Sequence, residues 1–220
     1  MTLVVQPSKI VCIGRNYAEH AKELGNEVPK EPLIFLKPPS ALLPPGGTII
    51  MPRVSRQVEF EGEIGVVIGK RAHRVAEAEA ESFIAGYTCV NDVTCRDLQK
   101  TDGQWTRAKG FDTFCPVGPR VVSLDWRTLS VLTRVNGVER QRAPSSDMIF
   151  SIPRLVAHVS AIMTLEAGDL IATGTPAGVG VFRDPPVFLE PGDRARCEIE
   201  GIGMVENPVV DWTDDPRQDP

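Results

Sequence analysis

The stretch that most constrains this chain is V-E-F-E-G-E-I-G-V-V-I-G-K, from Val58 to Lys70. It places Glu59, Glu61 and Glu63 at every second position and then continues into an apolar run. Because alternate residues of a β-strand share one face, a strand here puts three carboxylates on the same side. Like charges this close repel each other, and each is costly to bury without a partner. The chain must therefore either expose these acids or bring positive charge to them.

Two interpretations of this stretch are open. In the first, it is an edge strand whose acidic face points into solvent, which prevents edge-to-edge pairing of sheets. In the second, the acids lead into a buried strand, because Phe60 lies on the opposite face and G-V-V-I-G is typical of a core strand. A buried set of carboxylates would bind a hard divalent cation such as Mg²⁺, Mn²⁺ or Ca²⁺.

One more acid is a candidate for such a site. The segment from Phe83 to Asp92 is predicted to be a strand that ends in Asn91 and Asp92. An Asp at a strand end is a candidate third metal ligand. Alternatively, Asp92 or Thr94 caps the helix that follows.

Composition and charge exclude several classes of function. The chain has 220 residues, of which 42% are hydrophobic, enough for one domain with a small appendage. A net charge of -5 gives no basic surface of the kind that binds nucleic acid. No apolar run is long enough to span a membrane, and the N-terminus lacks an export signal, so we expect a cytoplasmic protein. The five cysteines are scattered without C-x-x-C, which predicts free buried thiols.

The turn residues predict a β-rich α+β fold, because 19 Gly and 19 Pro separate many short apolar segments. Asn136-Gly137 predicts a β-hairpin, and Ile152 to Met163 has the spacing of an amphipathic helix. We expect a small N-terminal segment with a lid helix over residues 1–50. A main domain that carries the acids follows over residues 51–210, and then a disordered polar tail over residues 211–220.

A short helix is predicted after Gly14, with Asn16 as its N-cap and Gly25 near its end. It would have about two turns, too few to be stable alone in water. His20 and Glu23 are three residues apart and therefore share one face of this helix. They are either part of a solvated polar face or a carboxylate that orients an imidazole for use as a general base.

Basic and Gly-rich segments complete the candidate set. Lys109 is predicted to lie in a loop between aromatic residues, either as a surface lysine or as a cation aimed at an anionic substrate. The segment T-G-T-P-A-G-V-G lacks the Gly-Lys-Ser/Thr ending of a phosphate-binding loop, so a nucleotide site is excluded. Its N–H groups could still form a small anion-binding nest.

Taken together and in order, several stretches resemble the fumarylacetoacetate hydrolase family. The similar segments cover most of residues 9–205 and are G-R-N-Y-A-E-H-A-K-E-L, E-P-L-I-F-L-K-P, F-E-G-E-I-G-V-V-I-G-K, N-D-V-T-C-R-D-L-Q, W-T-R-A-K-G-F-D-T-F-C-P-V-G-P, V-N-G-V-E-R-Q, M-I-F-S-I-P and G-D-L-I-A-T-G-T-P-A-G-V-G. The resemblance is strongest to a small subgroup of acylpyruvate hydrolases, oxaloacetate decarboxylases and hydroxyheptadienedioate isomerases of aromatic catabolism. It implies a mixed β-roll or β-sandwich core with a few short helices, and a homodimer.

The resemblance also implies roles for individual residues. The metal ligands for Mg²⁺ or Mn²⁺, with Ca²⁺ as a substitute in crystals, would be Glu61, Glu63 and Asp92. The catalytic residues would be His20, Glu23 and Lys109. The substrate-binding residues would be Arg96, Gln99 and Thr175. Glu59 is then an additional acid, either behind the ligands or exposed.

The implied activity is hydrolysis of a carbon–carbon bond in a 2,4-dioxo acid, such as an acylpyruvate or fumarylpyruvate, through a metal-bound pyruvate enolate. The metal would act as a Lewis acid, Lys109 would add positive charge, and His20 would activate water. The alternatives are isomerisation of 2-hydroxyhepta-2,4-diene-1,7-dioate and related diacids, or decarboxylation of oxaloacetate, neither of which needs an attacking water. A binding protein for 2-oxo acids without turnover would not need the His20–Glu23 pair. T-D-G-Q-W is shorter than the insertion of acylpyruvase-type members, which predicts a different pocket rim.

Overall fold

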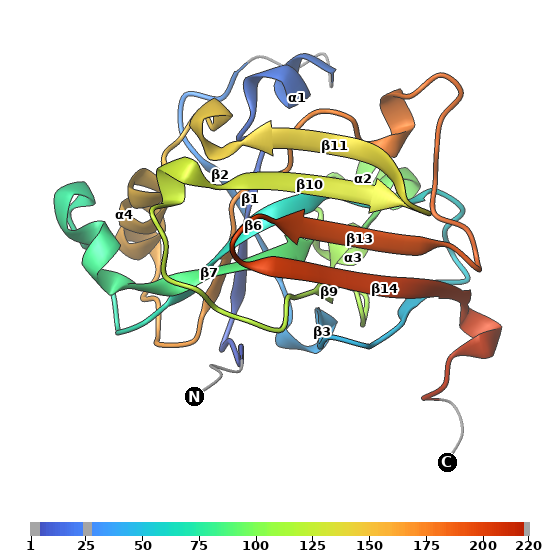
Figure 1. The fold of residues 1–220 in the computed structure, drawn as a ribbon, viewed down its shortest axis with the longest axis horizontal. Helices are drawn as coiled ribbons and strands as arrows, with labels where there is room; N and C mark the ends of the chain where they lie inside the picture. The colour runs from blue at the N-terminus through green and yellow to red at the C-terminus, as the bar shows by residue number, and fades with distance from the viewer. Residues whose placement is uncertain (1–4, 24–27, 218–220) are drawn as a thin grey trace.

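Two five-stranded sheets form the body of the protein in the computed structural model, which describes residues 5–23 and 28–217 (Figure 1). In order across the first sheet, the strands are β2 (Leu33–Lys37), β1 (Ile10–Gly14), β12 (Leu170–Ala172), β6 (Gly62–Ile68) and β7 (Ile84–Asn91). In order across the second sheet, they are β11 (Val138–Pro144), β10 (Ser130–Val135), β13 (Arg194–Ile199), β14 (Gly203–Asp211) and β4 (Ile49–Met51).

Short strand pairs and helices surround the two sheets. The strand pairs are β3 (Leu42–Leu43) with β9 (Cys115–Pro116), and β5 (Val58–Glu59) with β8 (Thr94–Cys95). The α-helices are α1 (Ala18–Glu23), α2 (Arg96–Asp102), α3 (Thr106–Lys109) and α4 (Ile152–Ile162). The 3₁₀ helices are η1 (Pro39–Ala41), η2 (Glu77–Phe83), η3 (Trp126–Thr128), η4 (Ser145–Asp147), η5 (Gly180–Phe182) and η6 (Trp212–Asp214).

Both sheets are mixed. β1 runs parallel to β12 and β14 runs parallel to β4, whereas the other pairs within the two large sheets are antiparallel. The β10–β11 hairpin turns at Asn136 and Gly137, which have φ angles of 51° and 77°, as a two-residue hairpin turn requires. The β-rich, mixed-sheet α+β fold predicted from the sequence is therefore confirmed.

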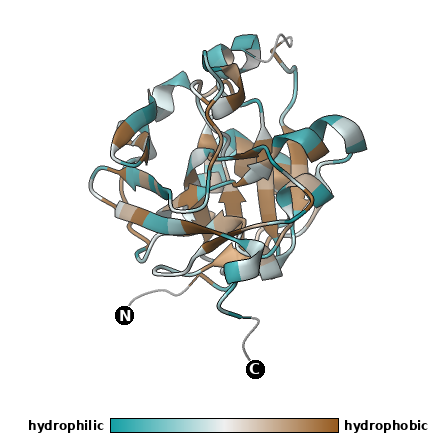
Figure 2. Cartoon of the chain, turned by 90° about the vertical axis from the view of Figure 1, so that its right-hand side faces the viewer, coloured by the Kyte–Doolittle hydropathy of each residue, from teal (hydrophilic) through white to brown (hydrophobic). Residues whose placement is uncertain are grey.

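The main core lies between the two sheets and is closed at one end by α4. Ile64 and Val66 of β6 pack in the same cluster as Val131 of β10, Ile199 of β13 and Leu155 of α4. Figure 2 shows that apolar residues gather on the strands inside the molecule, while polar residues dominate the surrounding helices and loops. Burial of this apolar surface is the main source of stability.

The structure corrects the predicted organisation of the chain. β1 and β2 lie in the same sheet as β6 and β7, so the expected boundary at residue 50 passes through a sheet. The tail is ordered beyond Asp211, because η6 follows directly and Arg217 forms ion pairs with Asp112 and Asp215. Residues 218–220 lie outside the described part of the chain.

Asn16 is not the N-cap that the sequence predicted. Its side chain is buried; the amide nitrogen donates hydrogen bonds to the carbonyls of Phe150 and Thr173, and the amide oxygen accepts one from the N–H of Phe150. It therefore ties the end of β1 to two distant segments, and α1 begins at Ala18. Gly25, the expected end of this helix, lies outside the described residues.

The predicted free thiols are confirmed, because all five cysteines are buried and unpaired. Across residues 5–23 and 28–217, the structure has no helix that is both long and apolar enough to cross a membrane.

Gly62 marks the closest approach of the two sheets, which leads to a test of the packing. A Cβ at Gly62 would overlap Thr133 Oγ1 on β10. We expect Gly62→Ala to lower the free energy of unfolding by about 1–3 kcal/mol, the usual cost of overpacking. Urea unfolding measures this change. Adding Thr133→Ala should restore most of the loss, and an equal loss in the double variant would contradict the proposed overlap.

Candidate metal centre and active site

Three buried carboxylates converge where the chain passes from β5 to β6. The strand pattern is interrupted at Phe60 and Glu61, and Phe60 is buried in a second core cluster. Glu61, Glu63 and Asp92 each offer an oxygen atom, and these oxygens all lie within 4.8 Å of one another. Glu61, Glu63 and Asp92 are 5%, 1% and 1% exposed. The interpretation of this stretch as a solvent-facing edge strand is therefore wrong.

Backbone hydrogen bonds fix the three acids relative to one another. The N–H of Asp92 donates to the carbonyl of Glu61 at 2.8 Å, and the side-chain oxygen of Asn91 accepts from the N–H of Glu61 at 2.9 Å. The N–H of Gly174 donates to Glu63 Oε2 at 2.8 Å. The candidate third ligand identified from the sequence, Asp92, thus lies beside the other two.

Lys109 compensates two of these charges. It ends α3 rather than lying in a loop, and it is 2% exposed, which excludes a surface lysine. Its Nζ donates to Glu61 Oε2 at 2.9 Å, to Asp92 Oδ2 at 2.6 Å and to Thr94 Oγ1 at 2.7 Å. Thr94 therefore supports Lys109 and does not cap α2.

Lys37 is a second buried cation that sequence reasoning missed. Its Nζ lies 2.7 Å from Asp92 Oδ1 and donates to the carbonyls of Val93, Phe114 and Lys109. It is 1% exposed, so burial of its charge depends on these partners. The only sequence signal was a lone lysine at the end of an apolar strand, a pattern equally typical of an exposed strand end.

Arg96 compensates Glu61 from the other side, and Glu59 holds it there. Arg96 Nε and Nη2 donate to Glu59 Oε2 at 2.8 and 2.5 Å, and Nη2 also donates to Glu61 Oε1 at 2.5 Å. Arg96 Nη1 donates to Gln99 Oε1 at 2.5 Å. Glu59 is completely buried rather than exposed, so it acts through Arg96.

The charges of this cluster do not balance. Four carboxylates, those of Glu59, Glu61, Glu63 and Asp92, face three cations, those of Lys37, Arg96 and Lys109. Burial raises the pKa of Glu61, but Lys109 and Arg96 outweigh it and lower the value to about 2. Burial, together with the charges of Asp92 and Glu61, raises the pKa of Glu63 well above its ordinary value of 4.5. Of these four acids, Glu63 is therefore the one that burial and its acidic neighbours most disfavour in the charged form unless a cation binds.

A hard divalent cation fits this donor set. All three acids offer oxygen atoms, the preferred ligands of Mg²⁺, Mn²⁺ and Ca²⁺. An uncompensated buried carboxylate also favours a bound cation. The residues that would hold it are the three predicted from the sequence.

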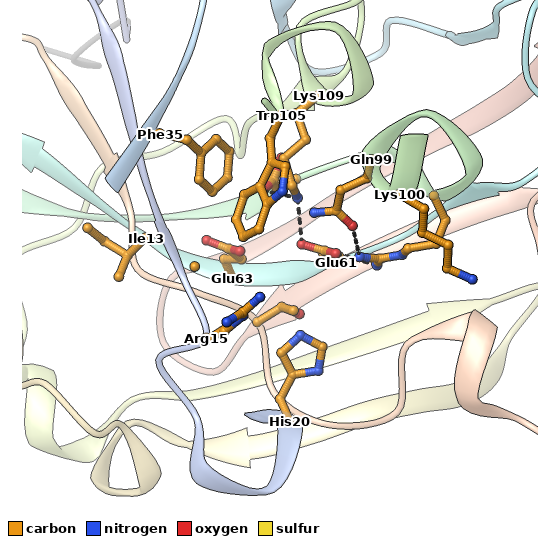
Figure 3. Close-up of a pocket in the computed structure, with 14 residues that line it drawn as sticks. Ile13, Arg15, His20, Phe35, Glu61, Glu63, Gln99, Lys100, Trp105 and Lys109 are labelled. Carbon is orange, nitrogen blue, oxygen red and sulfur yellow. Dashed lines mark hydrogen bonds and ion pairs between the residues drawn. The ribbon is translucent and has the colours of Figure 1, made fainter. Parts of the chain in front are cut away.

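The acids open into a cavity of about 180 Å³ (Figure 3). This volume suits a small organic acid, since pockets for drug-sized ligands measure about 300–1,000 Å³. All the predicted site residues except Glu23 line the cavity. The other lining residues are Ile13, Gly14, Arg15, Phe35, Lys100 and Trp105.

His20 enters the cavity from α1, on the side away from Lys109 and Trp105 (Figure 3). Its Nδ1 lies 3.4 Å from Glu23 Oε2, so the predicted pairing on one helix face is present. The N–H of Gly178 donates to both oxygens of Glu23, at 3.0 and 3.2 Å. This contact fixes a helix that is too short to be stable alone.

Thr175 lies in the same loop as Gly174 and Gly178. Its hydroxyl donates to the carbonyl of Gly62 at 3.0 Å and accepts from Gln141 Nε2 at 2.7 Å. The loop thus positions Thr175 at the cavity wall while its N–H groups bind the carboxylates of Glu63 and Glu23. The anion-binding nest considered from the sequence is used by the protein's own acids.

Known proteins share both the sequence and the fold. Residues 9–210 match the family described as fumarylacetoacetate (FAA) hydrolase C-terminal. The chain belongs to this family. Among its relatives, a mitochondrial protein of Bos taurus named oxaloacetate tautomerase FAHD2A is 46% identical over 213 residues, which cover 94% of this chain and 68% of the relative.

Solved structures of family members superimpose closely. A protein of Mycobacterium smegmatis described as 5-carboxymethyl-2-hydroxymuconate delta-isomerase is 47% identical, with a TM-score of 0.86 over 96% of this chain and 82% of that one. A 2-hydroxyhepta-2,4-diene-1,7-dioate isomerase of Mycobacterium marinum is 48% identical, with a TM-score of 0.84 over 94% of this chain and 76% of that one. These three similar proteins are named as one tautomerase and two isomerases.

The raised pKa of Glu63 predicts a pH-dependent stability of the metal-free protein. A carboxyl group with a raised folded-state pKa contributes stability below its ordinary pKa, and this contribution is lost as the pH rises through the folded value. In EDTA, the wild-type protein should therefore lose thermal stability relative to Glu63→Gln as the pH rises above the ordinary carboxyl pKa of 4.5. Mg²⁺ should reverse this loss in the wild type only. Parallel pH profiles of the two proteins in EDTA would contradict the assignment.

Lys37 is predicted to be essential for the stability of the centre. Replacing it by Met removes the cation beside Asp92 Oδ1 and the donor to three buried carbonyls, although Lys109 still contacts Asp92 Oδ2. We expect Lys37→Met to lower the free energy of unfolding by about 3–5 kcal/mol, measured by urea denaturation in EDTA. Lys30→Met is the matched control, because Lys30 is exposed. Equal stability of the two variants would show that Lys37 does not stabilise the centre.

Proposed function

We propose that this protein catalyses Mg²⁺- or Mn²⁺-dependent proton transfer next to the 2-oxo group of a small carboxylic acid, as a keto–enol tautomerase or double-bond isomerase. The observation that carries this proposal is the placement of Glu61, Glu63, Asp92, Lys109 and His20 around one small cavity. The names of the bovine and mycobacterial relatives support the same class of reaction.

Different residues would have different roles in such a reaction. Glu61, Glu63 and Asp92 would hold a divalent ion, which would supply a Lewis acid for the 2-oxo acid end of the substrate. Lys109 stays protonated, because the neighbouring Asp92 and Glu61 outweigh its burial and raise its pKa, and its charge stabilises negative charge that develops on oxygen. His20, oriented by Glu23, takes up and returns the proton at the adjacent carbon. Trp105 and Phe35, whose rings contact each other edge to face, form an apolar part of the cavity wall.

Carbon–carbon bond hydrolysis is the second candidate, and the His20–Glu23 contact favours it. The same pair that accepts a proton from carbon can also accept one from an attacking water. Decarboxylation of oxaloacetate requires no proton uptake from carbon or from an attacking water. It should therefore be less sensitive to replacement of His20 than proton transfer at carbon or carbon–carbon bond hydrolysis.

A turnover panel tests the proposal. Enol–keto conversion of oxaloacetate, isomerisation of hydroxymuconate-type diacids and cleavage of acetylpyruvate are followed by absorbance and product analysis. We expect conversion of one of the first two substrates without carbon–carbon cleavage, and its loss in EDTA. Release of acetate and pyruvate from acetylpyruvate would favour hydrolysis instead. Absence of any metal-dependent turnover would refute the proposal.

Two substitutions test the assigned roles. Lys109→Met should lower kcat by about 10²–10³, the usual effect of removing one electrostatic stabiliser. His20→Asn should lower it by about 10²–10⁴, the usual contribution of a general base. Both are measured at saturating Mg²⁺, with circular dichroism as the control for folding. An unchanged kcat in either variant would remove that residue from the mechanism.

A further inference from the structure

Arg15 is a cavity residue to which the sequence analysis assigned no role. It lies between the end of β1 at Gly14 and the start of α1 at Ala18, and it lines the same cavity as the three acids and His20. Figure 3 shows its guanidinium group between His20 and Glu63, on the opposite side of the cavity from Lys109 and Trp105. It thus lies on the other side of the cavity from Lys109, which pairs with Glu61 and Asp92 (Figure 3).

The partners of Arg15 differ from those of the other cations at the centre. Lys37, Arg96 and Lys109 each form an ion pair with at least one buried acid. Arg15 forms no ion pair with any acid in residues 5–23 and 28–217, and its Nε is buried without a hydrogen-bond partner. A buried donor without a partner is costly, so the site gains free energy if a ligand supplies the missing acceptor.

The main chain at Arg15 has a defined conformation. Its φ angle is 58°, in the left-handed region that non-glycine residues rarely adopt. The next residue, Asn16, is fixed by its bonds to Phe150 and Thr173. The backbone from which the Arg15 side chain reaches the cavity is therefore fixed.

We propose that Arg15 binds the second carboxylate of a 2-oxo dicarboxylic acid and makes the site selective for dicarboxylates over monocarboxylates of the same chain length. This inference rests on the proposed function, which places the 2-oxo carboxylate end of the substrate at the metal ligands and Lys109. A guanidinium group presents a planar set of donors that matches a carboxylate in two-point contact. The substrate class is therefore a short diacid that spans the cavity from the metal centre to Arg15.

Lys100 is the competing anchor for the second carboxylate, because it also lines the cavity. It is exposed, however, and an exposed ammonium group gains little from an ion pair. The buried Nε of Arg15 makes it the stronger anchor.

Binding of matched ligand pairs tests this inference without relying on turnover. The pairs are oxaloacetate with 2-oxobutanoate, and 2-oxoglutarate with 2-oxopentanoate, which differ only in a carboxylate or methyl end. Calorimetric titration with Mg²⁺ present gives the dissociation constants for the wild type, Arg15→Gln and Lys100→Gln. We expect Arg15→Gln to weaken binding of a dicarboxylate by about 10- to 100-fold, the range for a hydrogen bond to a charged group, and to change its monocarboxylate partner by less than about threefold. Lys100→Gln should preserve the preference for the dicarboxylate.

The outcomes separate this inference from the proposed function. A wild type that binds both members of each pair equally, or an Arg15→Gln variant that weakens both equally, overturns the role of Arg15 alone. Selective loss of dicarboxylate binding in Lys100→Gln assigns the role to Lys100 instead. A wild type that binds none of the four acids refutes both proposals. If Arg15→Gln does not fold, Arg15→Asn replaces it, because Asn tolerates the left-handed conformation.

Discussion

The burial of like charges is the constraint on which this structure depends. Carboxylates within 4.8 Å of one another can be buried only if cations reach them, and here the cations come from distant parts of the chain. Lys37 ends β2, Arg96 begins α2 and Lys109 ends α3. The cluster of acids therefore ties the first sheet to the helices beside it. The acids outnumber these cations by one, and the raised pKa of Glu63 indicates where the excess negative charge is least stable. A divalent cation would give the centre a net positive charge, which matches a small anionic substrate.

The loop from Thr173 to Gly178 connects the two halves of the active site. One of its N–H groups binds Glu63, a candidate metal ligand, and another binds Glu23, the partner of His20. A shift of this loop would move both groups together. The position of the proton-transferring residue is therefore coupled to the metal centre through the backbone rather than through the substrate alone, and Thr175 at the cavity wall belongs to the same unit.

Patterns within short segments of the sequence correctly predicted the features that depend on a single strand or helix. The alternation of acids, the strand end at Asp92 and the spacing of His20 and Glu23 each follow from the period of one strand or helix. The sequence could not reveal partners that come together only in the folded chain. Asn16 is a residue type that often caps helices, but its side chain forms hydrogen bonds with Phe150 and Thr173 instead. Lys37 and Arg15 showed no signal for the same reason, since a lysine or arginine at a strand end is normally exposed. The expected boundary at residue 50 was wrong because β1 pairs with β12, a strand about 160 residues further along the sequence.

The parallel pairing of β1 with β12 also bears on synthesis of the protein. Ile10 lies opposite Leu170, so the first sheet stays incomplete until the segment that contains Leu170 has left the ribosome. β13 and β14, which cover the core, emerge later still. During translation the acidic segment is therefore hydrated and separate from the loop that will hold Glu63. A nascent chain that stops before Gly174 therefore lacks the N–H groups that bind Glu63 and Glu23 in the folded protein.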